Sequence, residues 1–149
     1  MKYATKKDFD QANAFGLGDS NEAYAQFFIG QSYLKNLGAT SDDQLAFHNV
    51  TFEPACRNNW HVHKATKGGG QVLICTAGEG WYQEEGKDPV ELKGGSLVII
   101  PANVKHWHGA KADSWFSHIA VGVPGENTEN VWLEEVSDSD YQALSQFEK

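Results

Sequence analysis

The chain has 149 residues, 40% hydrophobic and 21% charged, which is the composition of one globular domain. Its formal net charge of −8, without any basic run, argues against nucleic-acid binding, because phosphate recognition requires clustered positive charge. No apolar run approaches the roughly 20 residues that cross a bilayer, so we also expect no membrane partner.

Residues 1–26 are mixed and polar, and we expect an N-terminal arm that is extended or forms a short helix. No apolar stretch follows the basic start, so a secretory leader is not indicated and we expect a cytoplasmic protein. The two cysteines, Cys56 and Cys75, are too few for a disulfide framework. We expect both to be reduced and half-buried.

Residues 27–136 predict a series of short strands. Phe27–Leu34 is rich in aromatic and β-branched residues, and Leu45–Phe52 alternates, with Ala46, His48, Val50 and Phe52 on one side. Further strands are predicted at Gln71–Thr76, Trp81–Glu85, Ser96–Ile100, Trp115–Val123 and Val131–Val136. The turn Ala77–Gly80 is expected to join the first two of these as a hairpin. Strands at this spacing, separated by Gly, Pro and Asn turns, favour an all-β sandwich or barrel.

Residues 137–149 predict a short C-terminal helix that belongs to the same domain. Ser137 and Asp140 form a Ser-x-x-Asp capping pattern. Behind them, Tyr141, Leu144 and Phe147 recur at helical spacing.

Two His-x-His pairs are the strongest chemical signal in the chain. They are His61-Val62-His63 and His106-Trp107-His108. Residues i and i+2 of a strand point to the same face, so each pair can aim two imidazoles into one space. Imidazole is a common ligand of Zn, Mn, Fe, Ni and Cu, and ligands from separate strands of a barrel can converge in its interior.

Residues 55–78 resemble the first cupin motif, G-x5-H-x-H-x(3,4)-E-x6-G, and residues 95–110 resemble the second, G-x5-P-x-G-x2-H-x3-N. The motif positions fall on Ala55, His61, His63, Gln71, Gly78, Gly95, Pro101, Asn103, His106 and Ala110. The resemblance implies a double-stranded β-helix, or jelly-roll barrel, spanning residues 27–136. It also implies one divalent metal ion per chain (Mn, Fe, Zn or Ni, with Mn favoured), held by His61, His63, Gln71 and His106.

The departures from the motif concern the fourth ligand above all. Gln71 replaces the usual Glu and makes the site less negative, so a bound ion would be a stronger Lewis acid. The insertion Lys64–Gly70 lengthens the loop before it, while Asn103 replaces a Gly but tolerates the same turn geometry. Two alternatives stay open: Gln71 lies near the metal without binding it, or the histidines line a barrel without metal.

The remaining histidines have two interpretations each. His108 shares a face with His106 and is either a nearby base or a hydrogen-bonded wall residue. His118 faces away from Ile119 on its predicted strand, and it is either a general base or a core residue. His48 is expected to be structural or exposed. Trp60, Trp81, Trp107 and Trp115 either wall a pocket or belong to the core and to a subunit interface.

Within the cupins, the chain is similar to small bacterial single-domain proteins that include manganese-dependent hydroxynitrile lyases. The shared runs are Trp60-His61-Val62-His63, Gln71 and His106-Trp107-His108-Gly109. The resemblance implies metal-assisted addition or elimination on a small oxygenated substrate, with His108 and His118 as the proton carriers. Gly122 departs from it, because those lyases carry a polar amide there.

Two other function classes compete with a lyase. One is a metal-dependent dioxygenase, and the other is a non-catalytic protein that binds a small molecule or serves as an accessory partner. The resemblance also implies a homodimer, in which the Phe27–Leu34 strand pairs with the neighbouring subunit's sheet.

Overall fold

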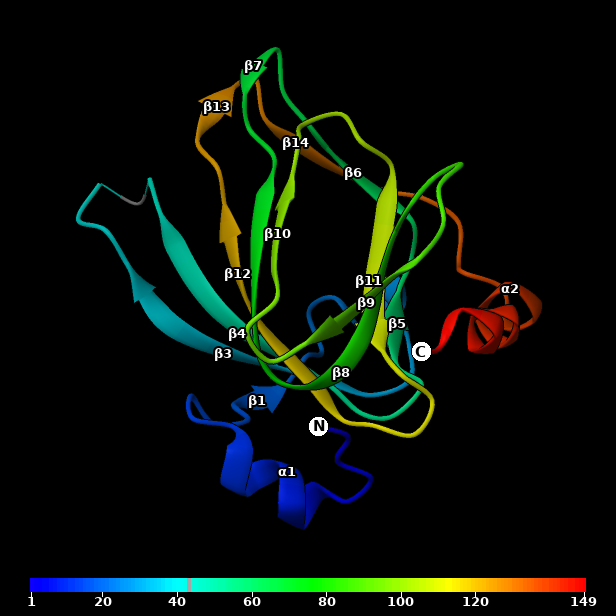
Figure 1. The fold of residues 1–149 in the computed structure, drawn as a ribbon. Helices are drawn as coiled ribbons and strands as arrows, with labels where there is room; N and C mark the ends of the chain where they lie inside the picture. Colours follow the sequence, from blue (N-terminus) through cyan, green and yellow to red (C-terminus); the bar gives the residue numbers. More distant parts are fainter. Residues whose placement is uncertain (43) are drawn as a thin grey trace.

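The computed structural model describes residues 1–42 and 44–149, and antiparallel strands form most of it (Figure 1). Two short α-helices lie near the chain ends, α1 (Lys6–Ala12) and α2 (Asp138–Ala143). The strands are β1 (Asp19–Ser20), β2 (Phe28–Ile29), β3 (Ser32–Ala39), β4 (Ala46–Phe52), β5 (Arg57–Asn58), β6 (His61–Lys64), β7 (Lys67–Gly68), β8 (Gln71–Glu84), β9 (Val90–Lys93), β10 (Leu97–Ile100), β11 (His106–Ala110), β12 (Phe116–Gly122), β13 (Gly125–Glu126) and β14 (Glu129–Trp132). The 3-10 turns η1 (Ala25–Phe27) and η2 (Leu144–Phe147) complete the elements.

Apart from β7 and β13, which pair only with each other, the strands curl into two sheets that share β8. The first sheet runs in the order β1-β3-β4-β12-β8-β10. The second contains β2, β5, β11, β8 and β9, and β6 joins it between β11 and β14. This is the all-β double-stranded β-helix that the cupin motifs implied, and its two sheets face each other across the site described below.

The long strand β8 corrects one sequence prediction, because Ala77–Gly80 is not a hairpin turn. β8 runs through 14 residues, pairing with β10 and β12 in its first half and with β9 and β11 in its second. The change of sheet occurs at Gly78, whose φ is +76°. A side chain there would place its Cβ 1.8 Å from the Trp115 carbonyl oxygen, so only glycine permits this corner.

The predicted strand Phe27–Leu34 is also divided between the two sheets. β2 pairs with β5 in the second sheet, whereas β3 pairs with β4 in the first. Gly30, with φ +87°, lies at the break, where an added Cβ would approach Cys56 to 3.1 Å. The aromatic and β-branched residues continue on both sides of Gly30, so strand propensity alone cannot reveal the break. The break depends on contact with Cys56, which is distant in the sequence.

The N-terminal arm covers part of the outer face of the first sheet. Thr5 caps α1 by accepting a hydrogen bond from the backbone N–H of Asp8. Phe9 is fully buried and stacks on Trp115, with ring centroids 5.6 Å apart. The arm thereby supplies the apolar cover that one side of an antiparallel sheet needs.

The C-terminal helix begins where the capping pattern predicted. The Ser137 side chain accepts a hydrogen bond from the N–H of Asp140. The buried Arg57 donates 2.9 Å to the Val136 carbonyl and lies 4.4 Å from the Tyr141 ring centre, which attaches α2 to the second sheet. The last strand, β14, ends at Trp132 and not at Val136 as predicted, because this attachment draws the chain away from the sheet.

Both cysteines are free thiols, and they are fully buried instead of half-buried. Burial raises the pKa of Cys56 and of Cys75 to about 12, so neither is a reactive thiolate. Within the described residues, no helix is long and apolar enough to cross a membrane.

Candidate metal centre and its cavity

Three histidines converge from two neighbouring strands of the second sheet. His61 and His63 lie on β6, and His106, at the start of β11, pairs directly with His61. One ligating nitrogen of each histidine lies within 4.8 Å of the others. His61 and His106 are buried, and His63 is partly exposed. The alternation of side chains along β6 brings the first two together, and the strand pairing supplies the third.

Each of these imidazoles has one ring nitrogen committed to an oxygen acceptor. The Nδ1 atoms of His61 and His106 donate to the carbonyls of Asn59 and Val104, at 2.8 and 2.9 Å. The Nδ1 of His63 donates to Oδ1 of Asn130 at 2.7 Å. An acceptor on Nδ1 places the proton there and leaves the lone pair on Nε2, which is the form that binds metal.

The Nε2 atoms are in surroundings that suit a cation. Nε2 of His106 is buried without a hydrogen-bond partner among the described residues, which is costly unless another group binds it. Nε2 of His63 lies 3.1 Å from Oε1 of Gln71. With Nδ1 protonated, both of these atoms carry lone pairs, and a shared cation would bind both. The donor set of imidazoles and one amide oxygen therefore fits a divalent ion.

Burial keeps the inner histidines neutral and their lone pairs available. It lowers the pKa of His106 to about 4 and holds the pKa of His61 well below its usual range. At neutral pH, neither ring carries the proton that would compete with a metal ion.

A second pair of imidazoles lies beside the triad. Nε2 of His118, on β12, lies 3.1 Å from Nδ1 of His108, on β11. The Asn58 side chain fixes His108: its Oδ1 accepts from the backbone N–H of His108 at 3.0 Å, and its Nδ2 lies 3.2 Å from Nε2 of the ring. Burial lowers the pKa of His118 to about 3 and that of His108 well below its usual range. Two neutral imidazoles in this contact share one proton, so one donates and the other accepts.

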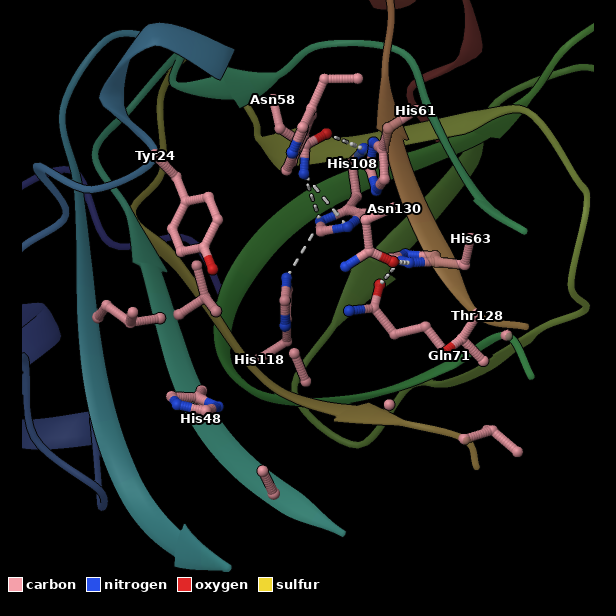
Figure 2. Close-up of a pocket in the computed structure, with 18 of the residues that line it drawn as sticks. Tyr24, His48, Asn58, His61, His63, Gln71, His108, His118, Thr128 and Asn130 are labelled. Carbon is pink, nitrogen blue, oxygen red and sulfur yellow. Dashed lines mark hydrogen bonds between the residues drawn. The ribbon is translucent and has the colours of Figure 1, made fainter. Parts of the chain in front are cut away.

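All five of these histidines belong to one site, and four of them line a cavity of about 610 Å³ (Figure 2). Such a volume is typical of small-molecule sites. His61, His63, Gln71 and Asn130 form one wall. The apolar side chains on the remaining walls include Phe28, Leu34, Val50, Ala120 and Trp132.

Comparisons with known proteins agree with this architecture. The cupin domain family matches residues 48–121. The (R)-mandelonitrile lyase of Granulicella tundricola is 36% identical over 124 residues, which cover 83% of this chain and 92% of that protein. This protein belongs to the cupin family.

Solved structures support the same assignment. A cupin-like protein from Thermotoga maritima is 36% identical to this cupin and superposes with a TM-score of 0.78. The match covers 89% of this cupin and 96% of the Thermotoga chain. A Klebsiella pneumoniae protein with a double-stranded β-helix domain is 19% identical and has a TM-score of 0.58, covering 70% of this cupin and 85% of its own chain. The second likeness shows the fold alone.

The tryptophans named from the sequence do not line the large cavity. Trp81 and Trp107 are buried in the cluster beneath α2, which Trp60 also contacts, and Trp115 packs beneath the N-terminal arm. The cavity instead receives Trp132, whose ring centre lies 4.6 Å from that of His61. No motif marks Trp132, because its place beside the histidines comes from the pairing of β14 with β6.

His48 is another cavity residue that sequence reasoning missed. It is half-buried and lines the cavity from β4, where a structural or exposed role was expected. The alternation of β4 contained the signal, because His48 shares its face with the fully buried Phe52.

Proposed function

We propose that this cupin is a metal-dependent lyase that interconverts a cyanohydrin with its aldehyde and hydrogen cyanide. The observation that carries the proposal is the position of three histidines, with ligating nitrogens within 4.8 Å of one another, beside the neutral His108–His118 pair on one cavity. The identity to a protein named (R)-mandelonitrile lyase points to the same class and makes mandelonitrile the first substrate to test.

His61, His63, His106 and the amide oxygen of Gln71 would hold one divalent ion in this proposal. The bound ion supplies a Lewis acid for the substrate oxygen. All four ligands are neutral, so they leave the charge of the ion uncompensated in a largely buried site, where electrostatic effects are strong. Manganese is the first metal to test. Iron, nickel and zinc should be tested as well, because imidazole and oxygen donors also accept these ions.

His108 and His118 would carry the proton. In the cleavage direction, the hydroxyl proton passes to the ring nitrogen of the pair whose lone pair lies outside the contact between the two rings, and the carbonyl bond forms. The bond to the nitrile carbon breaks, and cyanide leaves with the electron pair. Cyanide then takes the proton from the pair, so hydrogen cyanide departs and both imidazoles are neutral again. Burial of both rings excludes water from this transfer.

The test combines metal analysis with an assay on untagged protein. We expect about one divalent ion per chain and cleavage of mandelonitrile, followed as benzaldehyde absorbance. His61→Ala should lose both while keeping its circular-dichroism spectrum. A loaded wild-type protein that leaves a series of cyanohydrins intact would contradict the lyase proposal, and a folded protein that binds no metal would contradict the site.

We also propose a homodimer, with a different interface from the one expected of the Phe27–Leu34 strand. Seven apolar side chains form a bare face on the outside of the first sheet, next to the part covered by α1: Phe47, Val72, Ile74, Leu97, Ile99, Ile119 and Val121. Leu97 and Ile99 are 61% and 70% exposed. The bare face carries no charge, whereas the chain has a net charge of −8, so this is where two copies can meet without repulsion.

Light scattering at micromolar concentration tests the dimer. The wild type is expected at twice the chain mass, and Ile99→Glu at the mass of one chain, because a buried carboxylate pair opposes the contact. Val90→Glu is the matched control, since Val90 is 52% exposed but lies on β9, outside the bare face. A monomeric wild type would refute the proposal.

A further inference from the structure

His48 is the one cavity histidine that takes no part in the triad or in the His108–His118 pair. Its ring lines the cavity from β4, on the first sheet, whereas the triad lies on the second (Figure 2). Within the described residues, no side-chain hydrogen bond involves this ring. A half-buried imidazole without a protein partner is free to hydrogen-bond a ligand.

The surroundings of His48 leave room for such a ligand. Ala46 on the same strand and Ala120 directly opposite on β12 also line the cavity, and both have only a methyl group. Gly122 follows on the same face of β12, and an added Cβ there would meet nothing within 4 Å. We call Ala46, Ala120 and Gly122 the small-residue shelf. It widens the cavity around His48 without offering any polar side chain of its own.

Strand register places His48 within reach of the reacting centre. His118 pairs with Val50 and Ala120 pairs with His48, so His48 and His118 are diagonal neighbours on one face of adjacent strands. Such neighbours have Cβ atoms about 7 to 8 Å apart or somewhat less. A molecule of a few carbon atoms can therefore lie over His118 and contact His48 as well.

We propose that His48 donates a hydrogen bond to the second polar group of the substrate, the one that does not lie at the histidine triad. This inference rests on the proposed function, since it assumes that the triad end receives the substrate oxygen. The substrate class is then a small molecule with an oxygen and a second hydrogen-bond acceptor on one short skeleton. In a cyanohydrin, that acceptor is the nitrile, so His48 would contact the leaving group.

Two stable ligands of equal shape test this contact without any turnover. They are 3-hydroxy-3-phenylpropanenitrile, whose nitrile nitrogen accepts a hydrogen bond, and 1-phenylbut-3-yn-1-ol, whose linear alkyne does not. Binding is measured by calorimetry on the manganese-loaded protein. The wild type is expected to bind the nitrile about fivefold more tightly, the size of one neutral hydrogen bond.

Two variants separate the hydrogen bond from the shape of the cavity. His48→Leu should bind both ligands equally, and His48→Gln, which keeps a donor, should retain most of the preference for the nitrile. Equal binding by the wild type, the same preference in His48→Leu, or no binding of either ligand would each overturn the inference.

The outcome is independent of the lyase assay. A nitrile preference without cleavage of any cyanohydrin in the series would support the role of His48 and refute the proposed reaction. Cleavage by a wild type that shows no nitrile preference would support the reaction and refute the role of His48.

Discussion

Replacing His118 with phenylalanine is expected to lower mandelonitrile cleavage by about 10²- to 10⁴-fold, the usual contribution of a positioned proton carrier. The metal content should not change, because His118 contacts His108 and none of the triad nitrogens. Phenylalanine suits the site, since Phe52 and Phe116 already pack within 5.4 and 5.7 Å of the His118 ring centre.

The control for this prediction is the neighbouring residue on the opposite face of β12. Ser117 is equally buried, but it donates to Asn49 and does not line the cavity. Ser117→Ala should therefore keep its activity even where it loses some stability. Rates are compared at equal metal occupancy, with melting temperatures for each variant. If His118→Phe cleaves mandelonitrile at the wild-type rate, His118 is a core residue and not a proton carrier.

Replacing Asn130 with leucine is expected to weaken metal binding by about tenfold. The Nδ1 protons of His61 and His106 are held by backbone carbonyls, whereas that of His63 is held by the Asn130 side chain alone. Without that acceptor, the His63 ring can turn and place its proton on Nε2. Losses of this kind are about 10- to 100-fold, and the lower end applies because Asn130 is exposed and water can replace it.

Competition with a chelator measures the metal dissociation constant directly, without any assay of activity. Asn130→Asp keeps an acceptor of the same shape, so its affinity should equal or exceed that of the wild type. Thr128→Ala is the matched control, because Thr128 is an exposed cavity residue just before the same strand. An Asn130→Leu protein with wild-type affinity would show that His63 does not need this hydrogen bond.

Predictions from the sequence were reliable where the physical cause is local. The two His-x-His pairs depend only on the alternation of side chains along a strand, and the Ser137 cap depends on neighbouring residues of one helix end. The spacing of turns and strands favoured an all-β sandwich or barrel for the same reason, and the resemblance to the cupin motifs implied the double-stranded β-helix. The ligand set and the proton carriers stay predictions that the experiments above address.

Strand boundaries were predicted less well, because distant contacts decide them. Gln71–Glu84 is one strand, and its apparent turn is a corner at Gly78, where the backbone of Trp115 leaves no space for a side chain. Phe27–Leu34 is divided because its two halves find partners in different sheets.

The sequence by itself determined that the chain is all-β and that each His-x-His pair shares one strand face, since alternation and turn spacing are properties of the chain. Its resemblance to the cupin motifs implied the barrel. Only the tertiary structure decided which groups surround those histidines. Asn130, Trp132 and His48 reach the cavity through the pairing of β14 with β6 and of β4 with β12. Pairing between strands far apart in the chain depends on the closure of the whole barrel, which local sequence patterns do not encode.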